Sequence, residues 1–392
     1  MSAVAWVLGL LVLAELATRW WIRWRARYYV WAPGARFDIR LSPDLTPPLE
    51  PRVWFEVNSD GERGGPVPAM RHGLYRVLVA GGSPTECFLS DQHTSWHAEV
   101  ERELSTPEHL CALGARRVHV GNIGRSGVSA QDLDFILARV LPRYRRLDAL
   151  VIMIGGNDVF HWLEHGAPFP YPPTTVPVRR FFASHPEGPF LWGRPGKWAL
   201  VEGARRVRHR WLRPVDVEED AGGWIANARM MRMRATETRT SVPDPSDMLD
   251  RFELHFRRLL QRARGRAWRV LVARQPWFEK DYTPEEALHL WHGGIGSPWR
   301  QDVSVFYSLE VMNGLMRLID LRAMEVAAEL GIEQLDLNAV VVPGLEHYQD
   351  YVHYTPAGCA VVGQAVAAAL LRPAPSPARS RVEANVLNEV AP

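Results

Sequence analysis

Short β-branched runs alternate with longer amphipathic stretches along the chain from Tyr75 onward. The runs predict five strands, over residues 76–80, 117–120, 149–154, 269–273 and 332–337. The stretches predict helices over residues 86–104, 129–143, 246–265, 305–330 and 356–371. Because parallel strands are joined by crossover helices, the alternation predicts a doubly wound α/β domain with a five-stranded parallel sheet over residues 71–372.

Two segments interrupt this alternation, at residues 160–245 and 276–303. Both are weak in periodicity and rich in aromatic residues, Pro, Gly and Arg, so we interpret them as insertions over one edge of the sheet and as candidate lids. Their aromatic rings suit sugar faces or acyl chains, although a lid also needs rings for a small core of its own. Residues 31–70 are expected to form an irregular lead-in, and residues 373–392 a disordered tail.

The N-terminal residues 1–30 are predicted to form a membrane anchor. Ala3 to Ala14 is an uncharged apolar run, and a belt of tryptophans and arginines follows it over residues 19–27. A cleaved signal peptide carries its positive charge before the apolar run, whereas here the arginines follow it. An amphipathic helix lying on the membrane, or a buried helix, stays open as an alternative, since twelve uncharged residues fall short of the roughly twenty that span a bilayer.

Composition excludes some classes of partner. Of the 392 residues, 46 are basic and 44 acidic, so no whole-chain field favours nucleic acid. Three scattered cysteines predict neither a disulfide framework nor a zinc site. His93 and His97 have the four-residue spacing of metal ligands, but the expected Glu between them is absent, so ordinary half-buried histidines are favoured and no metal or cofactor is expected. The arginine-rich run at 205–213 has two interpretations, a solvated helix face or a surface for anionic polymer or lipid headgroups.

The first candidate for chemistry is Ser83, which follows the first strand directly after Gly81 and Gly82. In an open α/β sheet the ligand lies beyond the carboxyl ends of the strands, and the glycines permit a tight turn close to a ligand. Ser83-Pro84-Thr85-Glu86 also matches a capping box, in which Ser83 caps a helix and Glu86 reaches back to it. The two roles are compatible.

Polar residues at other strand ends match the needs of a nucleophilic serine. Asp350 and His353 stand three residues apart before the last predicted helix, a spacing that allows a carboxylate to orient an imidazole general base. Asn157 follows the third strand through two glycines, and its side-chain amide is a candidate oxyanion donor, as are the N–H groups of Gly127 and Ser83. Taken singly, each motif could also have a purely structural role, as a turn or a helix cap.

The ordered set Gly-x-Ser, Asn-x4-Gly, Gly-x-Asn-Asp and Asp-x2-His resembles the SGNH (GDSL-type) hydrolase superfamily over about residues 70 to 372. The resemblance implies a three-layer α/β/α sandwich with a flavodoxin-like sheet and no metal. It also implies Ser83 as nucleophile, Asp350 and His353 as its acid and base, and Gly127 and Asn157 as oxyanion donors. The usual Gly-Asp-Ser-Leu stands here as Gly81-Gly82-Ser83-Pro84, which puts the subfamily in doubt more than the chemistry.

The sequence therefore predicts a serine esterase that removes an acyl group, such as acetate, from a carbohydrate or lipid-like substrate. Two alternatives stay open: an acyltransferase that passes the same acyl group to a sugar hydroxyl, and a non-catalytic carbohydrate-binding protein on the same scaffold. Arginines at 19–27 predict a cytoplasmic catalytic domain, whereas the resemblance favours the periplasmic side, on which anchored relatives act.

Overall fold

The computed structural model describes residues 3–24, 28–43, 45, 49–69, 72–145, 147–176, 178–182, 192–212 and 214–373. Its centre is a five-stranded parallel sheet with the spatial order β10-β8-β5-β3-β4. The strands are β3 (Leu74–Gly81), β4 (Arg117–Asn122), β5 (Leu147–Met153), β8 (Ala267–Arg274) and β10 (Glu333–Asp336). This is the flavodoxin-like order, so the predicted fold class and all five predicted strands are confirmed.

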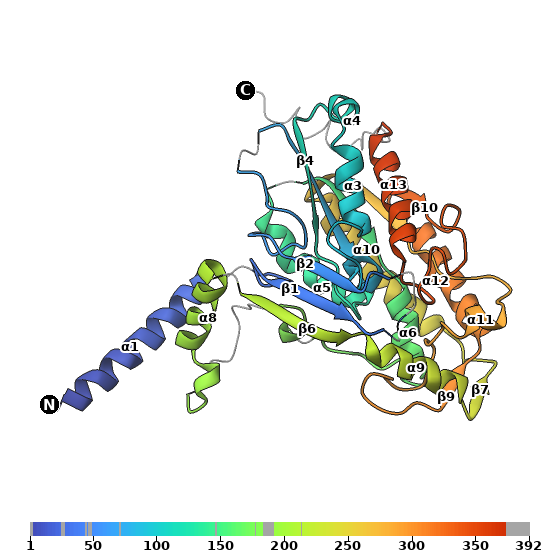
Figure 1. The fold of residues 1–392 in the computed structure, drawn as a ribbon, viewed down its shortest axis with the longest axis horizontal. Coiled ribbons are helices and arrows are strands. Elements are labelled where there is room, and N and C mark those ends of the chain that lie inside the picture. The colour runs from blue at the N-terminus through green and yellow to red at the C-terminus, as the bar shows by residue number, and fades with distance from the viewer. Residues whose placement is uncertain are drawn as a thin grey trace, which may run out of the picture.

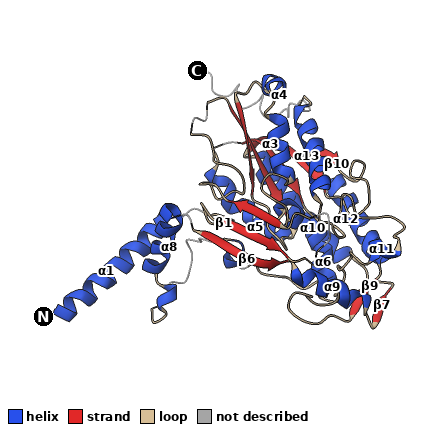
Figure 2. Ribbon diagram, viewed as in Figure 1, coloured by secondary structure: helices blue, strands red, loops and turns tan. Residues whose placement is uncertain are grey.

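Helices cover both faces of this sheet, as Figures 1 and 2 show. The strand order reverses after β4, so right-handed crossovers place the helices that follow β3 and β4 on opposite faces. One layer pairs α3 (Trp96–Leu104) with α13 (Pro356–Leu371). The other contains α5 (Ala130–Val140), α10 (Ser246–Arg264) and α12 (Leu309–Glu329), in which α10 contacts both neighbours.

Two predicted helices begin later than expected. The helix expected from residue 86 begins only at Trp96, because a four-residue helix α2 (Ser83–Glu86) ends at Cys87 with a left-handed φ of 52°. The helix expected from residue 305 begins at Leu309, because β9 (Val305–Tyr307) pairs with β7 (Glu237–Arg239). Ser308 then caps α12, with its side chain accepting the N–H of Val311.

The expectation of an irregular lead-in over residues 31–70 is wrong. β1 (Arg36–Leu41) and β2 (Arg52–Glu56) form an antiparallel pair, and β6 (Val215–Ala221) adds to β1 in parallel. β6 comes from the segment 160–245, which also holds α7 (Val178–Phe181), α8 (Ala199–Leu212) and α9 (Gly223–Met233). The lead-in and the first insertion therefore build a second sheet together, visible beside the main sheet in Figure 2.

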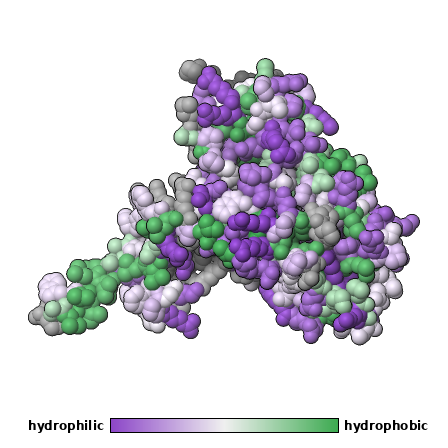
Figure 3. Space-filling model, viewed as in Figure 1, coloured by the Kyte–Doolittle hydropathy of each residue, from purple (hydrophilic) through white to green (hydrophobic). Residues whose placement is uncertain are grey.

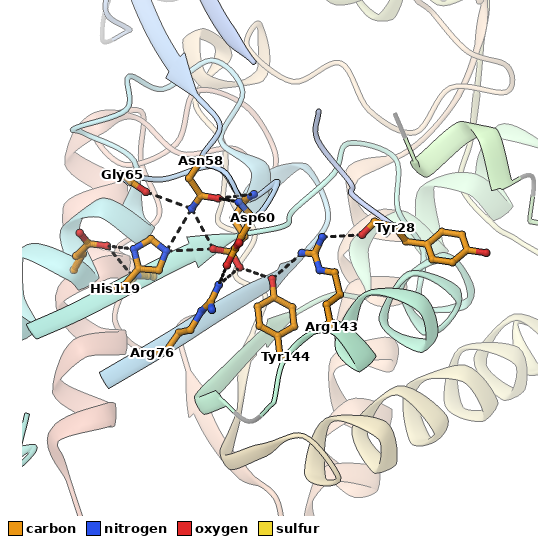
Figure 4. A network of polar contacts seen from close by, with 11 residues as sticks. Tyr28, Asn58, Asp60, Gly65, Arg76, His119, Arg143 and Tyr144 are labelled. Atoms are coloured by element: carbon orange, nitrogen blue, oxygen red, sulfur yellow. Dashed lines mark hydrogen bonds and ion pairs between the residues drawn. The ribbon is translucent and has the colours of Figure 1, made fainter. Parts of the chain in front are cut away.

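A buried polar network fastens the lead-in to the main sheet (Figure 4). The fully buried carboxylate of Glu62 lies 2.9 Å from a guanidinium nitrogen of Arg76 on β3 and 3.2 Å from Nε2 of His119 on β4, and accepts the hydroxyl of Tyr144. Burial alone raises the pKa of Glu62, but the hydrogen bond with His119 and the charge of Arg76 outweigh it and lower that pKa to about 2. The lead-in is thus part of the folded body.

The N-terminal segment is a single helix, α1 (Ala3–Trp24), that projects from the body in Figure 1. Ala3–Ile22 is long and apolar enough to cross a membrane, and only 6% of its most apolar window is buried. The remaining short helices are α4 (Pro107–Ala112), α6 (Gly156–Glu164) and α11 (Pro284–Ala287). The predicted disordered tail lies outside the described residues from position 374 onward.

Candidate active site

β3 leads into Ser83 at the carboxyl edge of the main sheet through Gly81 and Gly82. At both positions a larger residue would require its neighbours to move. A Cβ at Gly81 would lie 2.1 Å from the carbonyl oxygen of Met153, and a Cβ at Gly82 would lie 2.7 Å from Nδ2 of Asn157. β3 and β5 therefore approach closely where their ends meet, at the point where the strand order reverses.

Ser83 is not a helix cap, which corrects the capping-box alternative. Gly82 is the N-cap residue of α2, no side chain caps that helix, and Ser83 is its first residue. Glu86 does not reach back, and its carboxylate instead accepts the hydroxyl of Ser126. The Ser83 hydroxyl is consequently available for another partner.

That partner is His353. Nε2 of His353 lies 2.8 Å from Oγ of Ser83, and Nδ1 of the same ring lies 2.8 and 2.9 Å from the two carboxylate oxygens of Asp350. Oδ1 of Asp350 also accepts the backbone N–H groups of Val352 and His353, at 3.0 and 2.9 Å. The structure thus brings together the serine, histidine and aspartate that the sequence singles out, in a continuous hydrogen-bonded chain.

Within the hydrogen-bonded set of Ser83, His353 and Asp350, the surroundings of Asp350 favour its charged form. Burial raises the pKa of Asp350, but the positive charge and hydrogen bond of His353 outweigh it and hold the pKa well below its usual range. Burial lowers the pKa of His353, and the Asp350 carboxylate reverses that effect and leaves it above its ordinary value. A buried anion that stabilises an imidazolium is what a serine–histidine nucleophile requires.

Gly127 and Asn157 lie in the wall of the same cavity as Ser83 and His353. Gly127 adopts a left-handed φ of 68°, a conformation that favours glycine, and its carbonyl accepts a guanidinium N–H of Arg180 at 2.8 Å. Nδ2 of Asn157 donates one hydrogen to the carbonyl of Val128 at 3.1 Å, which leaves its second amide hydrogen for a ligand. The predicted oxyanion donors therefore line the same cavity as Ser83.

Asp158, the last residue of the Gly-Gly-Asn-Asp motif, connects two helices near the site. Its carboxylate accepts the N–H of Ala130 at 3.0 and 3.2 Å, where α5 begins. This bond ties the first turn of α6, which also carries Asn157, to the start of α5, three residues after Gly127.

Two further residues of the site were not assigned to it by sequence. The indole N–H of Trp291 donates to Oδ2 of Asp350 at 3.0 Å, and His292 stacks on Trp291 with ring centroids 3.7 Å apart. Both come from the segment 276–303, where no motif distinguishes them from the other aromatic residues. Burial lowers the pKa of His292 to about 3, so its ring is neutral beside the charged aspartate.

His292, Asp350 and His353 offer donor atoms that all lie within 4.8 Å of one another, a group that could hold a metal ion. In the structure Nδ1 of His353 is instead hydrogen-bonded to Asp350, and a metal ion would have to replace that bond. The pair His93 and His97 is not arranged as helix neighbours, because His93 is exposed in the turn ahead of α3 and His97 is buried within it.

The cavity over Ser83 has a volume of about 820 Å³, and both insertions contribute to its wall. Trp224 from the first insertion packs edge-to-face on Trp291 and Trp299 from the second, with centroids 4.9 and 5.8 Å apart. Arg180, Glu164 and Arg300 also line it. The site is a roomy cleft with aromatic walls and a few charged groups, the usual form of an organic-ligand site.

No family model matches the chain, and no curated protein matches its sequence. Several solved structures match at low identity. An acetylxylan esterase from Geobacillus stearothermophilus is 15% identical, with 77% of this chain and 96% of that one covered and a TM-score of 0.38. The α/β hydrolase enzyme LAE5 from the metagenome of Lake Arreo is also 15% identical, with 76% and 94% covered and a TM-score of 0.40.

A member of the lipolytic G-D-S-L family from Veillonella parvula is 10% identical to this chain. The match covers 76% of this chain and all of the other, with a TM-score of 0.39. At these identities, what the chain does must be inferred from its own side chains.

Proposed function

We propose that this chain is a serine esterase of the SGNH type, which hydrolyses an ester through an acyl-enzyme on Ser83. The observation that carries the proposal is the hydrogen-bonded chain from Oγ of Ser83 through His353 to the buried Asp350. Asp350 and His353 are neighbours in the sequence, but Ser83 lies 270 residues from His353, so the bond between them depends on the tertiary fold. It supplies a nucleophile, a general base and an orienting anion.

In the proposed reaction, Oγ of Ser83 attacks the ester carbonyl carbon while Nε2 of His353 takes the hydroxyl proton. The negative charge that develops on the carbonyl oxygen is stabilised by the Asn157 amide and by the N–H groups of Gly127 and Ser83. The C–O bond to the alcohol then breaks, and His353 returns the proton to the departing oxygen. Water, activated by His353, attacks the acyl-enzyme, releases the acid and restores Ser83.

For the substrate, we propose an O-acyl group such as acetate on a carbohydrate or lipid-like molecule. The cavity of about 820 Å³ is far larger than an acetyl group needs. Exposed faces of Trp224 and Trp299, 40% and 44% exposed, offer flat apolar surface on which sugar rings or acyl chains pack. The alcohol part of the ester would occupy this aromatic region.

A fluorophosphonate probe, which reacts with activated serine hydroxyls, tests the catalytic proposal. Wild-type protein should be labelled, Ser83→Ala should not, and Ser126→Ala should be labelled normally, because Ser126 also lines the cavity but contacts Glu86 instead of a histidine. Equal labelling of wild type and Ser83→Ala, or no labelling of wild type, refutes the assignment. The second result would leave a non-catalytic carbohydrate-binding protein as the better account.

Product analysis separates hydrolysis from transfer. With an acetylated oligosaccharide as substrate, a hydrolase releases free acetate in an amount equal to the alcohol formed. An acyltransferase instead produces a newly acetylated sugar when an acceptor is added, with less acetate than alcohol. Dominance of the acylated acceptor would refute the esterase assignment while leaving Ser83 as nucleophile.

We also propose that α1 is an uncleaved membrane anchor and that the catalytic domain lies outside the cytoplasm. The exposed apolar surface of α1 supports the anchor, and the resemblance to envelope-active enzymes supports the side, although the arginines at 19–27 favour the opposite one. A phosphatase reporter fused after residue 372 should be active. An active cytoplasmic reporter at that position, with an inactive phosphatase, would place the domain inside.

A further inference from the structure

Helix α8 packs against the anchor helix α1. The side chain of Glu15, only 2% exposed, accepts the backbone N–H groups of Ala199 and Leu200, at 2.8 and 2.9 Å, where α8 begins. Nε of Arg19 donates to the same carboxylate at 2.8 Å. One turn further along both helices, Gly203 faces Thr18 so closely that a Cβ would lie 3.2 Å from the Thr18 methyl group. Figure 1 shows the two helices side by side.

This contact fixes the level of α8 relative to the membrane anchor. Before Glu15, α1 exposes apolar side chains such as Leu8 and Leu13, 58% and 64% exposed, and Figure 3 shows this end as hydrophobic. After it come Trp20 and Trp24, stacked at 5.5 Å and mostly exposed. Tryptophans of this kind lie at the membrane–water interface. Because Gly203 lies beside Thr18 and the two helices run side by side, the part of α8 that follows Gly203 is level with Trp20 and Trp24 and lies at this interface.

The exposed side of α8 mixes arginines with apolar residues. Val201, Arg205, Arg208 and Leu212 follow one another at intervals of four, three and four, so they share one face of the helix. Trp211, 76% exposed, and Leu212, 73% exposed, extend this face at its C-terminal end. The Arg205 side chain is 57% exposed even though it pairs with Glu202. Guanidinium groups beside tryptophan and leucine suit the headgroup region, where each can find its preferred medium.

We propose that α8 is a second membrane element, an interfacial helix whose exposed face binds the anionic headgroups of the bilayer that α1 enters. Because the chain reaches α8 from the catalytic body and returns through β6, this helix would hold the body at the lipid surface instead of leaving it tethered by α1 alone. The proposal rests on the assignment of α1 as an anchor. It does not depend on the side of the membrane or on the reaction.

The test measures where α8 lies in full-length protein reconstituted into vesicles. Trp211→Cys, in a Cys111→Ser background, takes a nitroxide label; the other cysteines, Cys87 and Cys359, are buried. Trp268→Cys is the matched control, since Trp268 is 70% exposed on β8 of the catalytic body. Accessibility of each label to oxygen, which concentrates in lipid, is compared with accessibility to a water-soluble nickel chelate.

In vesicles that contain phosphatidylglycerol, the label at 211 should favour oxygen while the label at 268 favours nickel. Adding Arg205→Gln and Arg208→Gln should lower the interfacial partition constant at 211 by about thirtyfold, because each arginine near an anionic surface contributes about fivefold. Nickel accessibility at 211 equal to that at 268 overturns the proposal. So does interfacial insertion that is the same in pure phosphatidylcholine, which would mean apolar contact without headgroup recognition.

Two controls distinguish this proposal from two alternatives, that α1 is not an anchor and that α8 binds an anionic polymer. If alkaline carbonate releases the wild-type protein from the vesicles, α1 is not an anchor and the premise fails. If a soluble polyanion protects the label at 211 in the absence of vesicles and lipid does not, the face binds an anionic polymer and the membrane assignment is wrong. Neither outcome touches the fluorophosphonate result at Ser83, so the two proposals fail separately.

Discussion

Arg63 is predicted to hold in place residues 83–90, the segment that begins with the nucleophile Ser83. Its side chain is buried, with one guanidinium nitrogen donating to the carbonyls of Glu86 and Cys87 and the other to that of Ser90, all at 2.6 Å. Nε adds a longer bond of 3.3 Å to the side-chain oxygen of Gln92. These carbonyls follow directly on α2, the short helix that begins with Ser83, so Arg63 fixes the segment that presents the nucleophile.

The substitution Arg63→Met removes these donors while keeping an unbranched side chain. The carbonyls of Glu86 and Ser90 lose their donor, while that of Cys87 keeps the backbone N–H of Ser90 at 3.0 Å. At about 1–3 kcal/mol for each carbonyl left unpaired, the free energy of unfolding should fall by roughly 2–6 kcal/mol. This is a large part of the roughly 5–15 kcal/mol by which a folded domain is stable. Arg63→Lys keeps the charge but offers one nitrogen where the guanidinium offers three, and it should lose an intermediate amount.

Thermal unfolding followed by near-ultraviolet circular dichroism measures the stability, with Arg40→Met as the matched control because Arg40 and its partner Glu219 are 52% and 57% exposed, and exposed ion pairs contribute little. The melting temperature should be lowest for Arg63→Met, intermediate for Arg63→Lys, and unchanged for Arg40→Met. Below the melting temperature of each variant, kcat for an activated ester should fall more than KM rises. A displacement of about 1 Å at the nucleophile costs on the order of a hundredfold in rate.

One result would refute this reasoning. Replacing a buried charge by an apolar side chain of similar length is sometimes neutral or stabilising, because the charge no longer has to be desolvated. If Arg63→Met melts at or above the wild-type temperature, the desolvation of the guanidinium outweighs its bonds to Glu86, Cys87 and Ser90. The hydrogen bonds of Arg63 would then not stabilise the folded protein.

The remaining predictions concern the proposed reaction. His353 must be neutral to take the Ser83 proton, and its pKa is raised, so kcat/KM should fall as the pH drops through a value above 6.5; an acid limb below 6 in a pH–rate profile would contradict this. Asp350→Asn should lower kcat about ten-thousandfold with the fold intact by circular dichroism, because the amide favours the wrong imidazole tautomer. Asn157→Ala should lower kcat by roughly a hundred- to a thousandfold with little change in KM, whereas a change confined to KM would remove Asn157 from the oxyanion site. Gly82→Ala should also lower kcat, since the added Cβ would lie 2.7 Å from the Asn157 amide nitrogen, and an unchanged kcat would show that the loop yields freely.

The sheet and its order around the site could be predicted because their information is local. β-branched runs such as Val77–Ala80 and Ala149–Ile152 are buried on both faces of the parallel sheet, and this burial makes them continuous apolar segments. The glycines and polar residues that follow each strand mark the carboxyl edge. Ser83, Asn157 and His353 were therefore assignable without any knowledge of their distances.

The second sheet was missed although β1, Arg-Phe-Asp-Ile-Arg-Leu, alternates polar and apolar residues with the period of a half-buried strand. Its surroundings are rich in proline and glycine, and β6, the strand that pairs with β1 on the side away from β2, reads Val-Asp-Val-Glu-Glu-Asp-Ala, an acidic segment that is mostly exposed. Arg40 on β1 pairs with Glu219 on β6, 179 residues further along. Pairing over such a distance is decided by tertiary contacts, so propensity within each segment carries little information.

Trp291 and His292 were missed for a related reason. They lie in a loop, where neither periodicity nor a short motif fixes the direction of a side chain, and their role comes only from the approach of that loop to Asp350. A buried aspartate before a helix was foreseeable, but the indole N–H that donates to its carboxylate was not. Loop residues that orient a catalytic group are visible only once the scaffold that holds the loop is known.

Glu15 shows how a tertiary contact can reverse the meaning of a residue. In the sequence it shortens the apolar run to twelve uncharged residues and argues against a spanning helix, because a charge in hydrocarbon is costly. In the structure that carboxylate is enclosed by the first N–H groups of α8, 184 residues away, and by Arg19. Its hydrogen-bonding needs are met without water, so it no longer counts against insertion of α1. By accepting the first N–H groups of α8, Glu15 would instead fasten that arginine-bearing helix to the anchor. This role explains why an acidic residue occupies a position where an apolar residue was expected.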